Sequence, residues 1–266
     1  MGRAVHKLPE GEVVVGVTSL AGRIYVLRSK ERNQIEVYDV ITYRFQRCLT
    51  VQDARVFTDM TSCEHCLCVY IANHFGACVH RLDLDGSATQ WAVNDKPNGL
   101  SVNTAHNVLV TCRDVRKIKE FSSHGEMLRR ISFPDDVTHP WHAVQLASSQ
   151  FIVCHSDLDN AIHQVSMISA DGRHIVHSHG GQRGSDIGQY SKPRHLAVDS
   201  REFVFVADSD NRRVTLLSPT LNYVRQILAG GELTGGPGRL CLDVRRRLLH
   251  VADNGKRAGR VVIFSV

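Results

Sequence analysis

The chain lacks the features of membrane and secreted proteins. None of its apolar runs reaches the ~18 consecutive residues that a membrane-spanning helix needs. The first residues contain no apolar stretch of the kind that signal peptides carry, so we expect no such leader. Asn-x-Ser/Thr glycosylation sequons are absent as well. We therefore expect a cytoplasmic protein that makes no membrane contact.

A strong charge of one sign is also missing. The 32 Lys and Arg exceed the 27 Asp and Glu by five, which permits an anionic partner without demanding one. Eight cysteines could indicate disulfides, but a chain of 266 residues can bury its own core. Cys112 and Cys154 stand within apolar alternations that are typical of buried thiols. We expect free thiols in a reducing compartment.

The most informative pattern is an apolar run with a short polar tail that recurs along the chain. Examples are Val69-Tyr70-Ile71-Ala72-Asn73 and Val204-Phe205-Val206-Ala207-Asp208. Six copies end at residues that lie 45, 39, 43, 53 and 45 positions apart, namely Arg28, Asn73, Cys112, His155, Asp208 and Asp253. A period near 45 residues is typical of β-propellers, in which each copy forms one four-stranded blade.

Each copy divides into four short strands. β-branched residues alternate with polar ones, and turns such as Asp85-Gly86, His124-Gly125 and Asp171-Gly172 connect the last two strands. No convincing amphipathic helix interrupts the pattern. We therefore predict an all-β fold, a six-bladed propeller of four-stranded antiparallel blades in one domain, 1–266.

The ends of the chain indicate how the ring closes. The sixth copy stops after its third strand, and a spare segment precedes the first copy. We expect this N-terminal strand to complete the last blade and cover its open edge. The predicted blades span roughly 10–52, 53–94, 95–134, 135–180, 181–229, and 230–266 together with 2–8.

The later copies carry specific motifs. The fifth reads Pro193-Arg194-His195-Leu196-Ala197-Val198-Asp199 and then Val206-Ala207-Asp208-Ser209-Asp210-Asn211-Arg212-Arg213-Val214, which closely resembles the NHL repeat. The sixth copy matches less fully, and the first two lack the proline. The resemblance implies a six-bladed propeller similar to the C-terminal NHL domain of RING/B-box tripartite-motif proteins, which bind RNA or proteins.

The repeat proline marks a candidate binding surface. Superposing the copies stacks Asn98, Trp141, Arg194 and Gly238 at one position, and Gly99, His142, His195 and Arg239 at the next. Both positions are expected around one mouth of the central channel, where each innermost strand begins. The candidate ligand-binding residues are Lys96, Asn98, Trp141, His142, Arg194, His195, Arg212, Arg213 and Arg239.

Catalysis has little support in the sequence, and we expect no enzyme, cofactor or metal site. Gly-x-Ser-x-Gly and phosphate-loop motifs are absent. Calcium-dependent lactonases of the gluconolactonase class are also six-bladed propellers. They carry an acidic calcium ligand at the position that Arg194 occupies in this chain, and a cation there would repel Ca²⁺. Cys63-x-x-Cys66-x-Cys68 lacks a second paired motif, so we interpret these residues as buried or turn cysteines.

The sequence supports two binding functions almost equally. The first is single-stranded RNA binding, in which arginines contact phosphates while Trp141 and His142 stack on a base. The second is a protein-interaction module, as in the substrate-recruiting domain of a ubiquitin ligase-like parent, with Trp141 and arginines as a hot spot. A metal-dependent hydrolase is a remote third. We expect the isolated domain to be monomeric.

Overall fold

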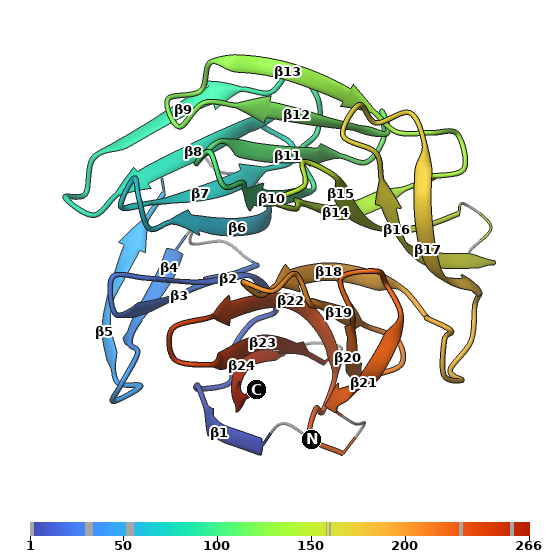
Figure 1. Ribbon diagram of the computed structural model, residues 1–266. Coiled ribbons are helices and arrows are strands. Elements are labelled where there is room, and N and C mark those ends of the chain that lie inside the picture. Colours follow the sequence, from blue (N-terminus) through green and yellow to red (C-terminus); the bar gives the residue numbers. More distant parts are fainter. Residues whose placement is uncertain are drawn as a thin grey trace.

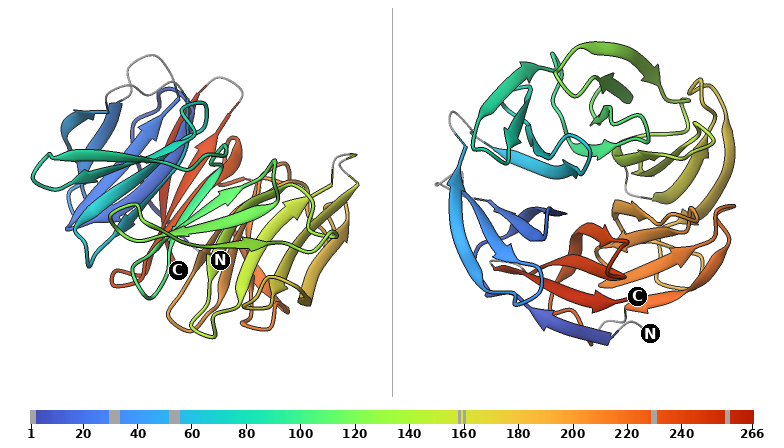
Figure 2. Two further views of the ribbon diagram at one scale, coloured as in Figure 1. Left: turned by 90° about the horizontal axis from the view of Figure 1, so that it is seen from above. Right: turned by 60° about the vertical axis from the view of Figure 1, so that its left-hand side comes forward.

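The computed structural model describes residues 3–29, 34–51, 56–157, 159, 161–228, 231–255 and 258–266. Within these ranges every regular element is a β-strand, and the strands form six four-stranded sheets. Figure 1 and Figure 2 show the sheets following one another around a ring. The predicted six-bladed propeller is confirmed.

The strands follow the chain from the ring axis outward in each of the first five sheets. Blade 1 contains β2 (Val14–Leu20), β3 (Arg23–Arg28), β4 (Gln34–Asp39) and β5 (Phe45–Thr50). Blade 2 contains β6 (Phe57–Cys63), β7 (Cys68–Asn73), β8 (Cys78–Asp83) and β9 (Ala88–Ala92). Blade 3 contains β10 (Gly99–Val102), β11 (Val108–Cys112), β12 (Lys117–Phe121) and β13 (Met127–Ser132).

The remaining blades repeat this order with one exception. Blade 4 contains β14 (Pro140–Gln145), β15 (Phe151–Ser156), β16 (Ile162–Ile168) and β17 (Ile175–Gln182). Blade 5 contains β18 (Pro193–Val198), β19 (Val204–Asp208), β20 (Arg213–Leu217) and β21 (Tyr223–Leu228). Blade 6 contains β22 (Gly236–Asp243), β23 (Leu248–Asn254), β24 (Gly259–Ser265) and, as its outer strand, β1 (Arg3–Lys7).

The N-terminal strand therefore closes the ring as predicted. β1 pairs antiparallel with β24, from Arg3 opposite Ser265 to Lys7 opposite Val262. Figure 1 shows β1 at the outer side of this blade. The pairing leaves β24 with a partner on both sides, so its edge is not open to another chain.

Apolar side chains hold neighbouring blades together. The described residues form six buried clusters, one at each interface between successive blades. The cluster that joins the last blade to the first includes Leu8, Val14, Val26, Val261 and Ile263. The apolar runs recognised in the sequence are the second strands, and β7, β11, β15 and β19 are buried along their whole length.

The hairpin glycines have the predicted conformation. Gly86, Gly125 and Gly172 have φ values of 93°, 90° and 81°, which an L-residue rarely adopts. None of the described residues belongs to a helix that could span a bilayer. The ring has two faces, and we call the one where the innermost strands begin the ring face. The turns between second and third strands lie on that same side.

Candidate functional site

A β-bulge at the start of the innermost strand shapes the ring face. The strand register shifts between Pro140 and His142, between Pro193 and His195, and between Pro237 and Arg239. The two blades without the proline have the same shift, between Val14 and Gly16 and between Phe57 and Asp59. A bulge inserts one extra residue and re-aims the side chains around it. The side chain of the residue after the proline and the side chain of the next residue therefore point in different directions.

The second of these positions points inward. Asp59, His142 and His195 are buried, and the side chain of Arg239 is only 18% exposed. The Arg239 Nε lies 2.9 Å from Asp59 Oδ1, and Asp59 Oδ2 lies 3.5 Å from His195 Nε2 and 3.9 Å from His142 Nε2. The two imidazoles stack with their centroids 3.8 Å apart. We call these four residues the axial cluster.

The axial cluster is an ion pair inside a frame of hydrogen bonds. Asp59 accepts the backbone N–H groups of Met60 and Leu100 at 2.9 and 2.8 Å, and Arg239 also donates to the carbonyl oxygen of Thr58. Burial by itself would raise the pKa of Asp59, but the Arg239 guanidinium offsets it, and that pKa lies well below its usual range. Asp59 is therefore an anion at neutral pH.

The histidines of the cluster are neutral. Burial, reinforced by the neighbouring His195, lowers the pKa of His142 to about 3, and burial also lowers the pKa of His195. The Nε2 of His142 donates to the carbonyl oxygen of Leu100 at 2.9 Å, so this nitrogen carries the proton. The Nδ1 of His195 accepts the N–H of Leu240 at 3.3 Å.

This donor set does not suit a metal ion, although Asp59, His142 and His195 place ligand atoms within 4.8 Å of one another. The His142 nitrogen nearest the carboxylate is occupied by its proton. The guanidinium of Arg239 already neutralises Asp59 and would repel a cation. The cluster therefore forms a buried polar contact that joins blades 2, 4, 5 and 6 near the ring face.

The sequence analysis missed Asp59, the anion around which the cluster is built. Copy two lacks the repeat proline, so the motif did not identify this position. The strand alignment contained a signal, because Asp59 stands opposite Ala72 just as His195 stands opposite Ala207 and Arg239 opposite Ala252. The remaining two members of this position are Gly16 and Gly99.

In blades 4 and 5 the first position after the proline faces outward and supplies Trp141 and Arg194. The indole of Trp141 is half-buried and donates from Nε1 to the Ser156 hydroxyl at 3.2 Å. The guanidinium carbons of Arg113 and Arg194 lie over the ring at 4.7 and 5.1 Å from its centroid. Since these arginines come from blades 3 and 5, they approach the indole of blade 4 from both neighbours. We call this group the Arg-Trp-Arg stack.

Arg194 differs from the other cations of the ring face. Burial lowers its pKa, with Arg239 adding to the effect, and its Nε is buried without a hydrogen-bond partner in the described structure. Arginine remains protonated in proteins. Asp210 acts on this cation from a distance, but no carboxylate of the described residues forms an ion pair with it. An anionic group from another molecule could compensate it.

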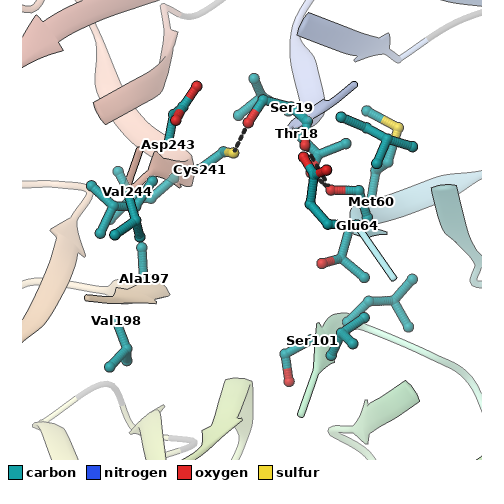
Figure 3. A pocket seen from close by; sticks show the side chains of 18 of the residues that line it. Thr18, Ser19, Met60, Glu64, Ser101, Ala197, Val198, Cys241, Asp243 and Val244 are labelled. Carbon is teal, nitrogen blue, oxygen red and sulfur yellow. Dashed lines mark hydrogen bonds between the residues drawn. The ribbon is translucent and has the colours of Figure 1, made fainter. Parts of the chain in front are cut away.

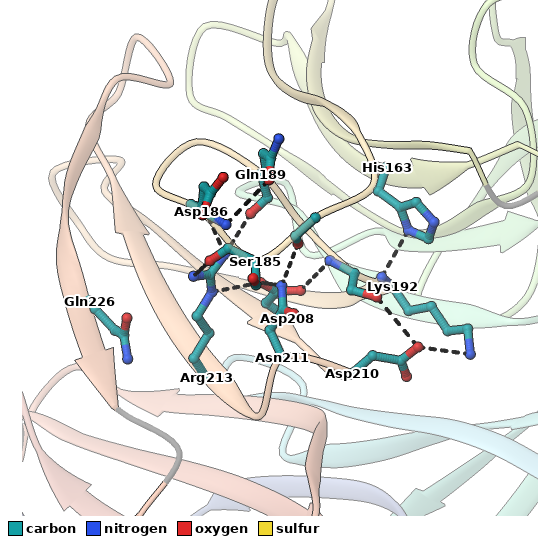
Figure 4. Close-up of polar contacts among 12 residues, drawn as sticks. His163, Ser185, Asp186, Gln189, Lys192, Asp208, Asp210, Asn211, Arg213 and Gln226 are labelled. Atoms are coloured by element: carbon teal, nitrogen blue, oxygen red, sulfur yellow. Dashed lines mark hydrogen bonds and ion pairs between the residues drawn. The ribbon is translucent and has the colours of Figure 1, made fainter.

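One other predicted ligand residue, Arg213, belongs to a structural network around Asp208 (Figure 4). The Nε of Arg213 lies 2.7 Å from the buried carboxylate of Asp208, and its other nitrogens donate to the carbonyls of Ser185 and Gln189. Burial raises the pKa of Asp208 to about 6, although Asn211, Ser191 and Arg213 act against it. Arg213 thus anchors the glycine-rich loop to blade 5 and is not free for a ligand.

The remaining predicted residues have different surroundings. The ammonium group of Lys192, beside the ring, lies 2.9 Å from Asp210, which also pairs with Arg183. Asn98 is buried on the ring face, whereas Lys96 and Arg212 are exposed. The fold thus brings these residues to one face but divides them into buried, paired and free groups.

A cavity of about 650 Å³ occupies the channel on the other side of the axial cluster. His142 and His195 line it together with Ser19, Ser101 and Cys241 (Figure 3). It extends along the innermost strands to the turns at Arg23 and Arg245, on the face opposite the ring face. Its lining mixes both charges, because Glu64 and Asp243 also border it.

The comparisons with known proteins agree on the architecture. The chain is similar to a streptogramin B lyase structure (11% identity, TM-score 0.67, covering 99% of this chain and 89% of that one). It is also similar to the β-propeller domain of Myceliophteria thermophila Cps50 (Swd1), at 12% identity, TM-score 0.66 and full coverage of both chains. Kuenenia stuttgartiensis hydrazine synthase matches at 13% identity and TM-score 0.66 over 95% of each chain.

The fold is that of a β-propeller. At these identities the likeness concerns architecture alone, since the same fold carries unrelated functions. No family model matches the chain, and no curated protein matches it. The resemblance of the fifth and sixth blades to NHL repeats therefore stays a prediction from their motifs.

Proposed function

We propose that the chain is a non-catalytic binding scaffold whose ring face recognises an acidic segment of a protein partner. The observation that carries the proposal is the Arg-Trp-Arg stack, in which the buried Nε of Arg194 has no hydrogen-bond partner in the described structure. Tryptophan and arginine dominate binding energy at protein interfaces, particularly in partly desolvated settings. A carboxylate from the partner would give Arg194 the bidentate hydrogen bonds that it lacks.

Charge pairing on the ring face favours protein over RNA. Arg239 and Arg213 neutralise the buried carboxylates of Asp59 and Asp208. Asp114 lies 3.4 Å from Arg113. Affinity for nucleic acid grows with the number of unpaired cations that contact successive phosphates, and these three arginines are already paired. A single carboxylate side chain needs only one such contact, at Arg194.

The indole and the imidazoles are poorly placed to stack on a base. Guanidinium groups already lie over Trp141, and His142 is buried in the axial cluster. Apolar groups are exposed on the same face instead, with Val115 on the turn that follows Arg113 and Phe75 on the corresponding turn of blade 2. A cation pair beside exposed apolar side chains is typical of a protein-binding surface.

The test compares the two ligand classes on the same protein. Random peptides displayed on phage are selected on the immobilised chain, and the enriched peptides and a pool of single-stranded RNA are titrated by fluorescence polarisation at two salt concentrations. We expect peptides that combine Asp or Glu with an apolar residue. Arg113→Gln with Arg194→Gln should weaken their binding by about tenfold or more, as expected for lost charge-assisted hydrogen bonds.

A double variant of Arg44→Gln and Arg47→Gln provides the matched control. Both arginines are exposed on blade 1, away from the stack, and the change in net charge is the same. Its peptide affinity should equal that of the wild type. Tight RNA binding that falls steeply with salt and is lost in the Arg113/Arg194 variant would contradict the proposal and establish an RNA reader.

A further inference from the structure

A second cavity lies between blades 5 and 6, away from the axis. Its volume is about 570 Å³, within the 300–1,000 Å³ typical of small-molecule sites. Phe203, Phe205, Leu216 and Leu242 line it, and they belong to or pack against the apolar cluster that joins the two blades. We call it the blade 5–6 pocket. Figure 1 shows these two blades side by side.

The strand pairing explains why this wall is apolar. Phe205 stands opposite Ala197 on one side and opposite Leu216 on the other, and Leu216 stands opposite Arg225. Directly paired residues share one face of a sheet. A row of apolar side chains thus crosses blade 5 and ends at an arginine on the outermost strand.

The charges around the pocket are predominantly positive. Arg201, Arg225 and Arg247 line it from the β18–β19 turn, from β21 and from the β22–β23 turn. Within the described residues, Arg225 and Arg247 have no ion-pair partner, while Arg201 lies over the ring of Phe203 at 5.2 Å.

Asp199 is the only acidic side chain that lines the pocket, and it is already engaged. Val266 also lines the pocket, and its backbone N–H donates to the carbonyl oxygen of Arg247 at 3.0 Å. Asp199 accepts the backbone N–H groups of Arg201 and Phe203 at 2.9 and 2.8 Å, so it holds the β18–β19 turn together. Its other oxygen lies 3.8 Å from Arg201. Arg225 and Arg247 therefore remain available to an anion from solution.

We propose that the blade 5–6 pocket binds a small organic carboxylate with a flat apolar body. The apolar body would lie against Phe203, Phe205 and Leu216, and the carboxylate would accept hydrogen bonds from Arg225 and Arg247. Guanidinium groups match the geometry of a carboxylate, and an apolar wall lowers the local dielectric and strengthens the pairing. This site is independent of the ring face and of the function proposed for it.

The probe for this site is 2-naphthoate, which combines an aromatic body with one carboxylate. Its binding is measured by saturation-transfer NMR and by calorimetry, beside that of the neutral 2-naphthalenemethanol and the cationic 2-naphthylmethylammonium. We expect the carboxylate to bind about tenfold or more tightly than either analogue, because only it can pair with the arginines. Equal affinity for the three probes would overturn the proposal.

Variants locate the site. Arg225→Gln with Arg247→Gln should weaken naphthoate binding by about tenfold or more, since both charged partners are lost. The matched control is Arg44→Gln with Arg245→Gln, two exposed arginines that do not line the pocket. An equal loss in the control, or no naphthoate binding to the wild type at its solubility limit, would also overturn the proposal. Urea unfolding verifies that each variant is folded.

Discussion

Two adjacent positions of the repeat have opposite surroundings in this propeller. The residue directly after the repeat proline faces the surface, where Trp141 and Arg194 form the Arg-Trp-Arg stack. The next residue faces the axis, where His142, His195 and Arg239 surround Asp59. A single step along the chain separates the proposed binding surface from the buried axial cluster. The cause is the bulge, because it re-aims neighbouring side chains.

The comparison indicates that substitutions at the two positions should affect different properties. Changes at the inner position should lower stability, since they disturb a buried ion pair or a close approach between blades. Changes at the outer position should affect partner binding and leave stability nearly unchanged. The predictions below test this division in order of decreasing effect.

Removing the cation of the axial cluster should have the largest effect. Arg239→Leu leaves Asp59 buried and charged without its partner, and such a change costs about 3–5 kcal/mol of unfolding free energy. The measurement is urea unfolding, with Arg212→Leu as the exposed control, for which we expect less than about 0.5 kcal/mol. Adding Asp59→Asn to Arg239→Leu should restore part of the loss. A stable Arg239→Leu protein would show that the pair is dispensable.

Lowering the pH should destabilise the folded protein, because several of its histidines are buried and neutral. Burial lowers the pKa of His142 to about 3 and the pKa values of His155 and His250 to about 4. Below pH ~6.5 the unfolded chain binds protons that the folded chain does not, so stability falls as pH decreases. Each histidine contributes up to about 1.4 kcal/mol per pH unit until its folded pKa is reached.

The check is the urea midpoint measured between pH 7.5 and pH 5. His250 is fully buried, and both of its ring nitrogens lack hydrogen-bond partners in the described structure. Replacing it with leucine should therefore make the stability curve less steep. The same slope in wild type and His250→Leu would show that this histidine does not contribute.

The inner glycines should tolerate a methyl group less well than the outer one. A Cβ at Gly16 would lie 2.6 Å from the Met60 Cβ, and one at Gly99 would lie 2.7 Å from the Trp141 carbonyl oxygen. Each alanine substitution should cost about 1–3 kcal/mol, as overpacking does. At Gly238 the nearest atom is the side-chain amide nitrogen of Asn254, which donates to the Val14 carbonyl oxygen at 2.8 Å. Only this side-chain hydrogen bond would have to shift, so we expect about 1 kcal/mol. Thermal unfolding of the three variants distinguishes these outcomes.

Local signals made the fold predictable. The recurring apolar run identified the second strand of every blade, and the Asp-Gly and His-Gly pairs identified hairpins whose glycines have positive φ. The missing fourth strand of the last copy predicted that β1 would pair with β24. Strand period and turn chemistry depend on neighbouring residues, which a single sequence contains.

The candidate site was predictable only in part. The proline motif found the ring and the outer Trp141 and Arg194, but it placed His142 and His195 on the surface, where they would contact a ligand. It also treated Arg213 and Arg239 as free cations, although each neutralises a buried aspartate. Asp59 and Arg239 are 180 residues apart in the chain, so the residues that surround Arg239 in the sequence do not indicate this ion pair.

The sequence by itself determined the number of blades, their strand order and the closure of the ring, because these follow from periodicity and from turn residues. The tertiary structure alone decided which charges are buried as pairs and which remain available. Ring closure brings the inner strands of separate blades to one axis, and there the low dielectric makes pairing necessary for every buried charge. The arginines without ion pairs at the ring face and at the blade 5–6 pocket are therefore the places where we propose that this protein binds other molecules.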